Sequence, residues 1–259
     1  MLFRTVYGIE LETIYAYIFG CNKKNIQPSK IDLSRTFIPA RQDGTYYSSQ
    51  NLDDAINFLK SAGLLIEQNG LFIAEQQKSG PFPIVLLQAL RNFELGYQPV
   101  NHPTDSIYLT LLTELYIKPN YIILPDLHAA ANQLKVVQDI GGLGKEKLQA
   151  WTRVMEYLGI GRRMQGNFMC IYSPNLIVHL IKRWPNDTGT LQSFFEDYFH
   201  TLLPFSRSDG ELSQSLIIPL KKLANRKIIE LYQLQDSPTR PYFGHLKYKG
   251  ITYKGARND

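Results

Sequence analysis

The chain has 259 residues, 44% of them hydrophobic, with a formal net charge of +5 and an isoelectric point near 9.0. This composition excludes a disordered chain, because enough apolar side chains are present to bury a core. No apolar run approaches the roughly eighteen residues of a membrane-spanning helix, so no membrane partner is expected. The length allows one large domain or two to three small ones.

The amino-terminal segment and the two cysteines bear on the compartment. Glu10 and Glu12 lie within the first helix-like stretch and no small-residue cleavage pattern follows, which argues against a signal peptide. Cys21 and Cys170 give neither a metal-binding spacing nor a disulfide framework. We therefore expect a reduced, cytoplasmic setting and no metal or cofactor.

The positive charge is unevenly distributed along the chain. Residues 1–100 hold nine basic and nine acidic side chains, whereas residues 181–259 hold twelve and eight. Most of the excess follows Lys221 and is interleaved with aromatic residues. A mixture of cations and aromatic rings is typical of nucleic-acid surfaces, although a basic tail can also be only a solvated end.

In chain order, the first predicted helix spans residues 8–20, where apolar side chains recur near helical spacing before a glycine. Residues 31–37 give no clear assignment. A second helix, capped by Ser48 or Ser49, ends at Gly63, because glycine takes the left-handed conformation at little cost. A hairpin is expected to follow.

The exposed face of this second helix is acidic at its start. Asp53 and Asp54 would meet phosphates if the helix entered a groove, and like charges oppose binding there. Acidic residues also suit the first turn of any helix through its dipole. On either interpretation we expect this first unit to dock a protein rather than nucleic acid.

Two further helices are predicted before the centre of the chain. Residues 84–93 are apolar nearly all round, which is typical of a buried helix, and they lie between linkers. The next helix is capped by Thr104 or Asp105, with Leu111 and Leu115 facing the core.

Residues 123–172 contain an amphipathic segment, a glycine turn, a second amphipathic segment and a hairpin in direct succession. The second segment has an apolar stripe at helical spacing and ends at Gly159. Short strands are expected on both sides of a turn at Gln165 and Gly166. The stripe consists of Leu148, Trp151, Val154, Met155 and Leu158.

The same order occurs earlier in the chain, which suggests an internal duplication. Residues 51–74 align with residues 147–170 without a gap, and both glycines and the apolar phase match. Helices, a tight turn and a hairpin in this order resemble the winged helix-turn-helix superfamily, at the level of fold only. The resemblance implies that the helix before each hairpin is a recognition helix and that the hairpin is its wing.

In the second unit this resemblance places polar and basic side chains where nucleic acid would lie. The predicted helix stripe is Lys145, Gln149, Thr152 and Arg153, and the wing adds Arg162 and Arg163. Gln and Arg have the bidentate geometry that suits adenine and guanine edges. A solvated helix face is the alternative interpretation, and the glycine-rich run at 141–145 lacks the full phosphate-loop pattern.

The last third of the chain is expected to repeat the order less regularly. Helices are predicted over residues 173–184, 191–203 and 212–224, and then strands over 227–235 and 245–253. Pro219 either interrupts the last helix or falls near its first turn, if that helix begins at Ile217 or Ile218. The expected nucleic-acid-binding residues here are Lys221, Lys222, Arg226, Lys227, Arg240, Lys247 and Lys249.

These interpretations combine into one prediction. The fold class is α+β, mainly helical with small β-hairpins, divided into units at residues 1–80, 104–184 and 185–259 with a helical connector at 81–103. No catalytic motif has a supporting context, so we expect a non-enzymatic protein that binds double-stranded DNA through the second unit and the basic carboxyl-terminal region. The alternative is a protein–protein adaptor in a chromosome-organising or phage-defence complex.

Overall fold

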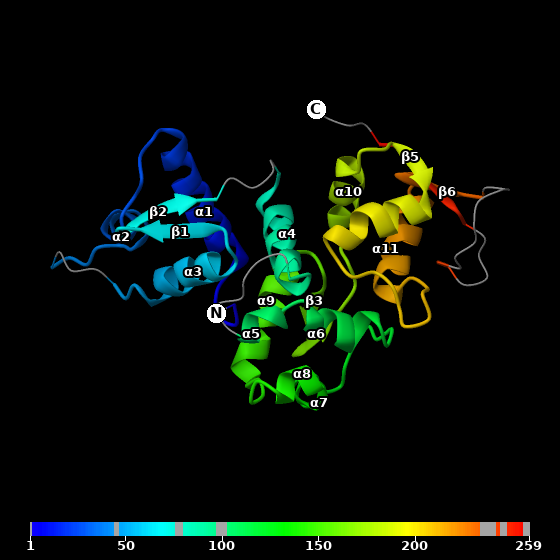
Figure 1. The fold of residues 1–259 in the computed structure, drawn as a ribbon, viewed down its shortest axis with the longest axis horizontal. Coiled ribbons are helices and arrows are strands. Elements are labelled where there is room, and N and C mark those ends of the chain that lie inside the picture. The colour runs from blue at the N-terminus through cyan, green and yellow to red at the C-terminus, as the bar shows by residue number, and fades with distance from the viewer. Residues whose placement is uncertain are drawn as a thin grey trace. The chain divides into compact units, whose positions relative to one another are not determined.

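The computed structural model describes residues 2–43, 47–75, 80–96, 103–233, 242–243 and 248–255. Two compact units are present: Met1–Leu109 with Lys135–Tyr157, and Thr110–Leu134 with Leu158–Asp259. Both combine helices with small antiparallel sheets of two or three strands, which confirms the predicted α+β class (Figure 1). The finer division into four segments stays a prediction. Among the described residues, no helix has the length and apolar character needed to cross a membrane.

The first unit is mainly helical and contains one two-stranded sheet. Its elements are α1 (Gly8–Lys23), α2 (Lys30–Phe37), α3 (Gln50–Ser61), β1 (Leu65–Gln68), β2 (Leu71–Ala74), α4 (Phe82–Glu94), α5 (Pro103–Ser106), α8 (Lys135–Gln138) and α9 (Lys145–Tyr157).

Helix α2 is the element of this unit that the sequence left unassigned. It begins at a capping box, in which the Ser29 hydroxyl accepts from the Asp32 N–H and the Asp32 carboxylate accepts from the Ser29 N–H. Hydrogen bonds from Ser29 lower the pKa of the Asp32 carboxyl. Ser29 also forms a β-bridge with Leu71, so a short extended segment joins β2 before α2 begins.

The core of the first unit includes an indole with a buried partner. Trp151 of α9 has no exposed surface, and its Nε1–H donates to the Tyr108 carbonyl oxygen at 2.8 Å. The apolar stripe predicted for residues 148–158 is buried along its whole length. The expectation of a core-facing helix here is therefore confirmed.

The second unit contains a two-stranded and a three-stranded sheet. Its elements are α6 (Thr110–Leu112), the π-helical η1 (Thr113–Ile117), α7 (Leu127–Gln133), β3 (Arg162–Met164), β4 (Asn167–Met169), α10 (Pro174–Arg183), β5 (Thr188–Thr190), the π-helical η2 (Ser193–Tyr198), the 3-10 turn η3 (Phe199–Thr201), α11 (Gln214–Asn225), β6 (Ile229–Tyr232) and β7 (Gly250–Tyr253).

Both two-residue hairpin turns have positive φ at each turn residue. The values are 51° and 76° at Asn69 and Gly70, and 48° and 82° at Gln165 and Gly166. Such turns match the twist of the flanking strands. The two hairpins therefore share the conformation that their alignment predicted.

The three-stranded sheet has the order β5-β7-β6, so the last of the described strands lies in its middle. The predicted strands 227–235 and 245–253 contain β6 and β7, while residues 234–235 and 245–247 lie outside the described residues. Strand β5 was missed, because it lies between the helices predicted over 173–184 and 191–203, where no strand was expected. Thr188 of β5 pairs with Thr252 of β7, a partner too distant for local periodicity to indicate.

Helix α11 begins at Gln214 and continues through Pro219, which corrects both the predicted interruption and the alternative start at Ile217 or Ile218. Proline has no N–H for the carbonyl group four residues earlier, here that of Ser215. The Ser215 carbonyl oxygen instead accepts from the Tyr172 N–H at 3.0 Å. Because this acceptor has another donor, the helix tolerates the proline.

The two cysteines should differ sharply in reactivity. Cys170 has no exposed surface, and burial raises the pKa of its thiol to about 12, although the Ser215 hydroxyl group opposes that rise. Cys21 is only half-buried. The Cys170 thiol should therefore stay protonated and enclosed at pH 8, where the thiolate is the reactive form.

We expect an aromatic disulfide reagent to label one thiol per native chain rapidly at pH 8 and two after denaturation. Labelling of a Cys21→Ser variant should be slow until the protein unfolds. Rapid labelling of that variant in its native state would contradict the buried position of Cys170.

Candidate nucleic-acid interface

Helix α11 has one buried face and one exposed basic face. Leu216, Leu220 and Leu223 are buried at helical spacing. The opposite side carries Ile218, Lys221, Lys222 and Asn225, and Arg226 and Lys227 follow directly after the helix. All six are exposed, and α11 contains no acidic residue. We call Lys221, Lys222, Arg226 and Lys227 the α11 basic cluster.

The turn that ends α11 contains a lysine with a left-handed backbone conformation. Lys227 has φ +59°, its N–H donates to the Ala224 carbonyl oxygen at 2.9 Å, and the Ile228 N–H donates to that of Leu223 at 3.0 Å. This is the Schellman pattern, in which glycine is usual. A left-handed conformation costs a side-chain-bearing residue about 1–2 kcal/mol.

The helices before the other two hairpins end at glycine in the same place. Gly63 and Gly159 have φ of 69° and 75°, each two residues after the end of α3 or α9. The Gly63 and Leu64 N–H groups donate to the Lys60 and Leu59 carbonyl oxygens, as in the α11 exit. Helices α3 and α11 thus end in the same hydrogen-bonded turn, and Gly159 after α9 has the same left-handed φ. Of these three left-handed residues, only Lys227 carries a charge.

The ionic surroundings of the α11 basic cluster differ from those of other cations in the second unit. Within the described part of the chain, none of its four side chains lies within ion-pair distance of a carboxylate, whereas Lys254 pairs with Glu230 and Arg207 pairs with Asp209 and Glu211. Unpaired exposed cations concentrate positive potential, which is the electrostatic requirement for binding phosphates.

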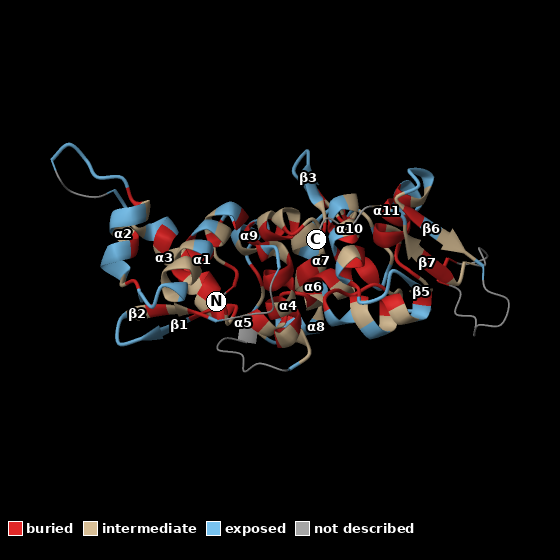
Figure 2. Cartoon of the chain, turned by 90° about the horizontal axis from the view of Figure 1, so that it is seen from above, coloured by how far each residue is buried: buried red, intermediate tan, exposed pale blue. Residues whose placement is uncertain are grey.

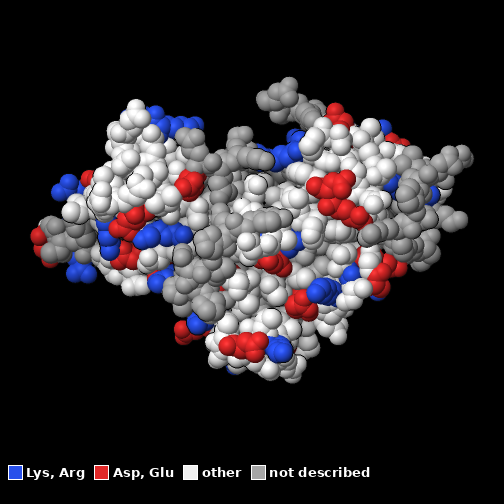
Figure 3. Space-filling view, in the orientation of Figure 1, with Lys and Arg blue, Asp and Glu red and all other residues white. Residues whose placement is uncertain are grey.

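Helix α3, which precedes the hairpin of the first unit, has acidic residues that are paired with basic side chains. Asp53 pairs with Lys30 at 2.8 Å, and Asp54 pairs with Arg4. In the first unit as Figure 3 shows it, basic and acidic side chains lie beside one another. The acidic residues seen in the sequence are therefore parts of internal ion pairs.

The predicted stripe on α9 is only partly exposed. Lys145 and Gln149 are exposed, and Arg153 is half-buried with its guanidinium 5.4 Å from the centre of the Tyr7 ring. Thr152 is buried, with 6% of its surface exposed, and its hydroxyl group donates to the Gln149 carbonyl oxygen. Its expected place on the exposed stripe was wrong, because it lies one turn from the core residue Leu148.

The hairpin β3–β4 exposes its two arginines. Arg162 and Arg163 are both exposed, and the hairpin is pale blue to its tip in Figure 2. The hairpin belongs to the second unit and α9 to the first. Their use as one wing and one recognition helix stays a prediction.

The remaining predicted cations lie at the last strand. Lys249 is half-buried just before β7, where its N–H donates to the Tyr232 carbonyl oxygen at 2.9 Å. Arg240 and Lys247 lie outside the described residues. Lys254, which the prediction omitted, is exposed just after β7. The only indication of Lys254 in the sequence was its position in the basic carboxyl-terminal region.

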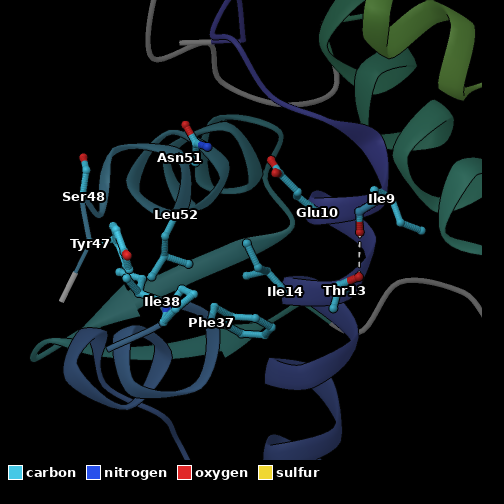
Figure 4. Close-up of a pocket in the computed structure, with 11 residues that line it drawn as sticks. Ile9, Glu10, Thr13, Ile14, Phe37, Ile38, Tyr47, Ser48, Asn51 and Leu52 are labelled. Carbon is cyan, nitrogen blue, oxygen red and sulfur yellow. Dashed lines mark hydrogen bonds between the residues drawn. The ribbon is translucent and has the colours of Figure 1, made fainter. Parts of the chain in front are cut away.

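The first unit has a different kind of surface feature, an apolar groove of about 320 Å³ between α1, the end of α2 and the start of α3 (Figure 4). Ile9 and Tyr47 at this groove are 64% and 55% exposed. Glu10 lines it, and no lysine or arginine is among its described lining residues.

Within the described residues, no three His, Cys, Asp or Glu side chains gather where they could hold a metal ion. No protein-family model, curated protein or solved structure matches this chain.

Proposed function

We propose that the chain is a tandem winged-helix protein that binds duplex nucleic acid without catalysing a reaction. The fold supports this through a recurring order of helix, β-segment, two helical segments and two strands. In the second unit α10, β5, η2–η3, α11, β6 and β7 follow it. In the first unit α1, the Ser29 bridge, α2, α3, β1 and β2 follow it. In this interpretation α11 is a recognition helix and β6–β7 is its wing.

The observation that carries the proposal is the α11 basic cluster. A helix with an exposed face that bears lysines and an asparagine, and with no acidic residue, fits the major groove of a duplex. The lysines can contact phosphates or guanine, and Asn225 can pair with adenine. The exposed arginines of β3–β4 provide a second place for backbone contact.

A direct experiment is the binding of a dye-labelled duplex followed by fluorescence anisotropy, beside a single strand of the same length. We expect tighter binding of the duplex, because a helix needs a groove in which to contact base edges. Equal affinity for both would reject groove recognition, and no binding at low salt would reject the function.

A second candidate function, protein docking, is favoured by the apolar groove of the first unit. Exposed Ile9 and Tyr47 would receive an apolar side chain, and Glu10 would receive a lysine or arginine beside it. The expected occupant is therefore a partner segment with an apolar anchor next to a cation. Ile9→Asp should abolish co-purification of such a partner, whereas Ile66→Asp on β1 should preserve it.

A further inference from the structure

The second unit contains a hollow of about 500 Å³ beside the carboxyl end of α11. Lys227 lines it at the helix exit, Ile229 and Leu231 line it from β6, and Lys254 lines it just after β7. Because β6 is an edge strand of its sheet, this hollow is bounded by the sheet on one side and the helix exit on the other. We call it the β6 hollow.

The chemistry of the β6 hollow combines cations with an apolar floor. Lys227 has no carboxylate within ion-pair distance in the described chain, and Ile229 is buried beneath the surface. Tyr248 adds a half-buried phenol, whose ring packs edge-on against Phe243 at 5.5 Å. Ammonium groups and a phenol suit phosphate oxygens, and an apolar floor suits the sugar between them.

Among the described lining residues of the β6 hollow, the acidic Glu230 opposes this use. Glu230 also lines the hollow, and its carboxylate lies 2.7 Å from the Lys254 ammonium group. Both side chains of the pair are about half exposed, at 54% and 50%. An exposed ion pair of this kind is weak, so a phosphate can compete with Glu230 for Lys254.

We propose that the β6 hollow binds the sugar–phosphate backbone of one strand of the duplex whose groove receives α11. This inference rests on the proposed function and adds Lys254 and Tyr248 to the contact residues. It also gives the left-handed Lys227 a role, since this residue ends the Schellman turn after α11 and lines the hollow. Glu230 then lowers the affinity of the chain for the duplex.

The test compares two opposite changes by anisotropy of a labelled duplex across salt concentrations. Lys227→Gln/Lys254→Gln should weaken binding about tenfold and reduce the salt slope by about two, since each phosphate contact contributes about 0.9. Glu230→Gln should strengthen binding about two- to fivefold, because it releases Lys254. Circular dichroism should show that each variant is folded.

Matched controls separate position from net charge. Glu114→Gln removes a carboxylate that pairs with Lys118 at 2.6 Å, also in the second unit, and should leave affinity within about twofold. Lys23→Gln/Lys24→Gln removes two exposed cations of the first unit and should do the same.

Failure of this inference and failure of the proposed function give different results. If the wild-type chain binds duplex and Lys221→Gln/Lys222→Gln weakens it, but the hollow variants keep wild-type affinity and slope, the β6 hollow is overturned and the function stands. Equal gains from Glu230→Gln and Glu114→Gln would also overturn it. If the wild-type chain does not bind duplex, both the proposed function and the role of the β6 hollow are contradicted.

Discussion

Reversing two charges on α11 should nearly abolish duplex binding. Lys221→Glu/Lys222→Glu places two carboxylates on the exposed face of α11, where no carboxylate of the described residues lies within ion-pair distance of the two lysines. We expect affinity at moderate salt to fall about a hundredfold or more, since two phosphate contacts are lost and two repulsions replace them. Anisotropy titration of a labelled duplex measures the loss.

The control for this variant reverses two lysines that have carboxylate partners. Lys30→Glu/Lys60→Glu changes the net charge equally, but these lysines pair with Asp53 and Glu67 in the first unit. We expect at most a few-fold loss of affinity from it, through the weaker field of the whole protein. Equal losses from the two double variants would show that net charge, and not α11, determines binding.

The hairpin arginines provide a graded comparison in the same titration. Arg162→Glu/Arg163→Glu should weaken binding less than the α11 reversal if the hairpin contributes only backbone contacts. An unchanged affinity would remove β3–β4 from the interface and leave the α11 proposal intact.

The largest expected effect on stability comes from Trp151. Trp151→Ala removes a fully buried indole and leaves the Tyr108 carbonyl oxygen without its donor. Truncating a buried tryptophan typically costs about 3–5 kcal/mol, and an orphaned buried acceptor adds about 1–3 kcal/mol. Urea unfolding followed by circular dichroism should therefore show that the first unit of this variant has little or no remaining stability in the absence of urea.

Two companion variants separate the contributions of volume and hydrogen bond. Trp151→Phe keeps most of the apolar contact but loses the donor, so its cost should lie well below that of alanine. Gln149→Ala changes an exposed residue of the same helix and should alter the free energy of unfolding by at most about 0.5 kcal/mol. A loss below about 1 kcal/mol for Trp151→Ala would contradict the described core.

Local chemistry explains which parts of this fold were predictable from the sequence. The glycines at positions 63 and 159 and the turns at 69–70 and 165–166 require left-handed backbone, so they mark helix ends and hairpins without knowledge of tertiary structure. Helix α2 could have been found too, because Ser29 and Asp32 have capping-box spacing.

The features that were missed depend on contacts between distant segments. Strand β5 exists because β7 pairs with it, and the α11 helix passes Pro219 because Tyr172 supplies a donor to Ser215. The ion pairs of Asp53 and Asp54 likewise join separate parts of the first unit. Thr152 is different, since its spacing of four from Leu148 already indicated a buried side chain.

Within the candidate interface, sequence located the charges but not their environment. The basic character of residues 221–227 was evident from the sequence. The absence of carboxylate partners around them in the described chain depends on the fold and was not. The same holds for Lys254, whose proximity to Lys227 depends on how β6 and β7 pair.

The most direct test is the affinity of the wild-type chain for a labelled duplex, measured as the salt concentration is raised. We expect a straight line of log affinity against log salt with a slope of about −4 or steeper, because the four cations of the α11 basic cluster would displace counterions. A slope near zero, or no binding at about 50 mM salt, would contradict the claim that α11 contacts nucleic acid.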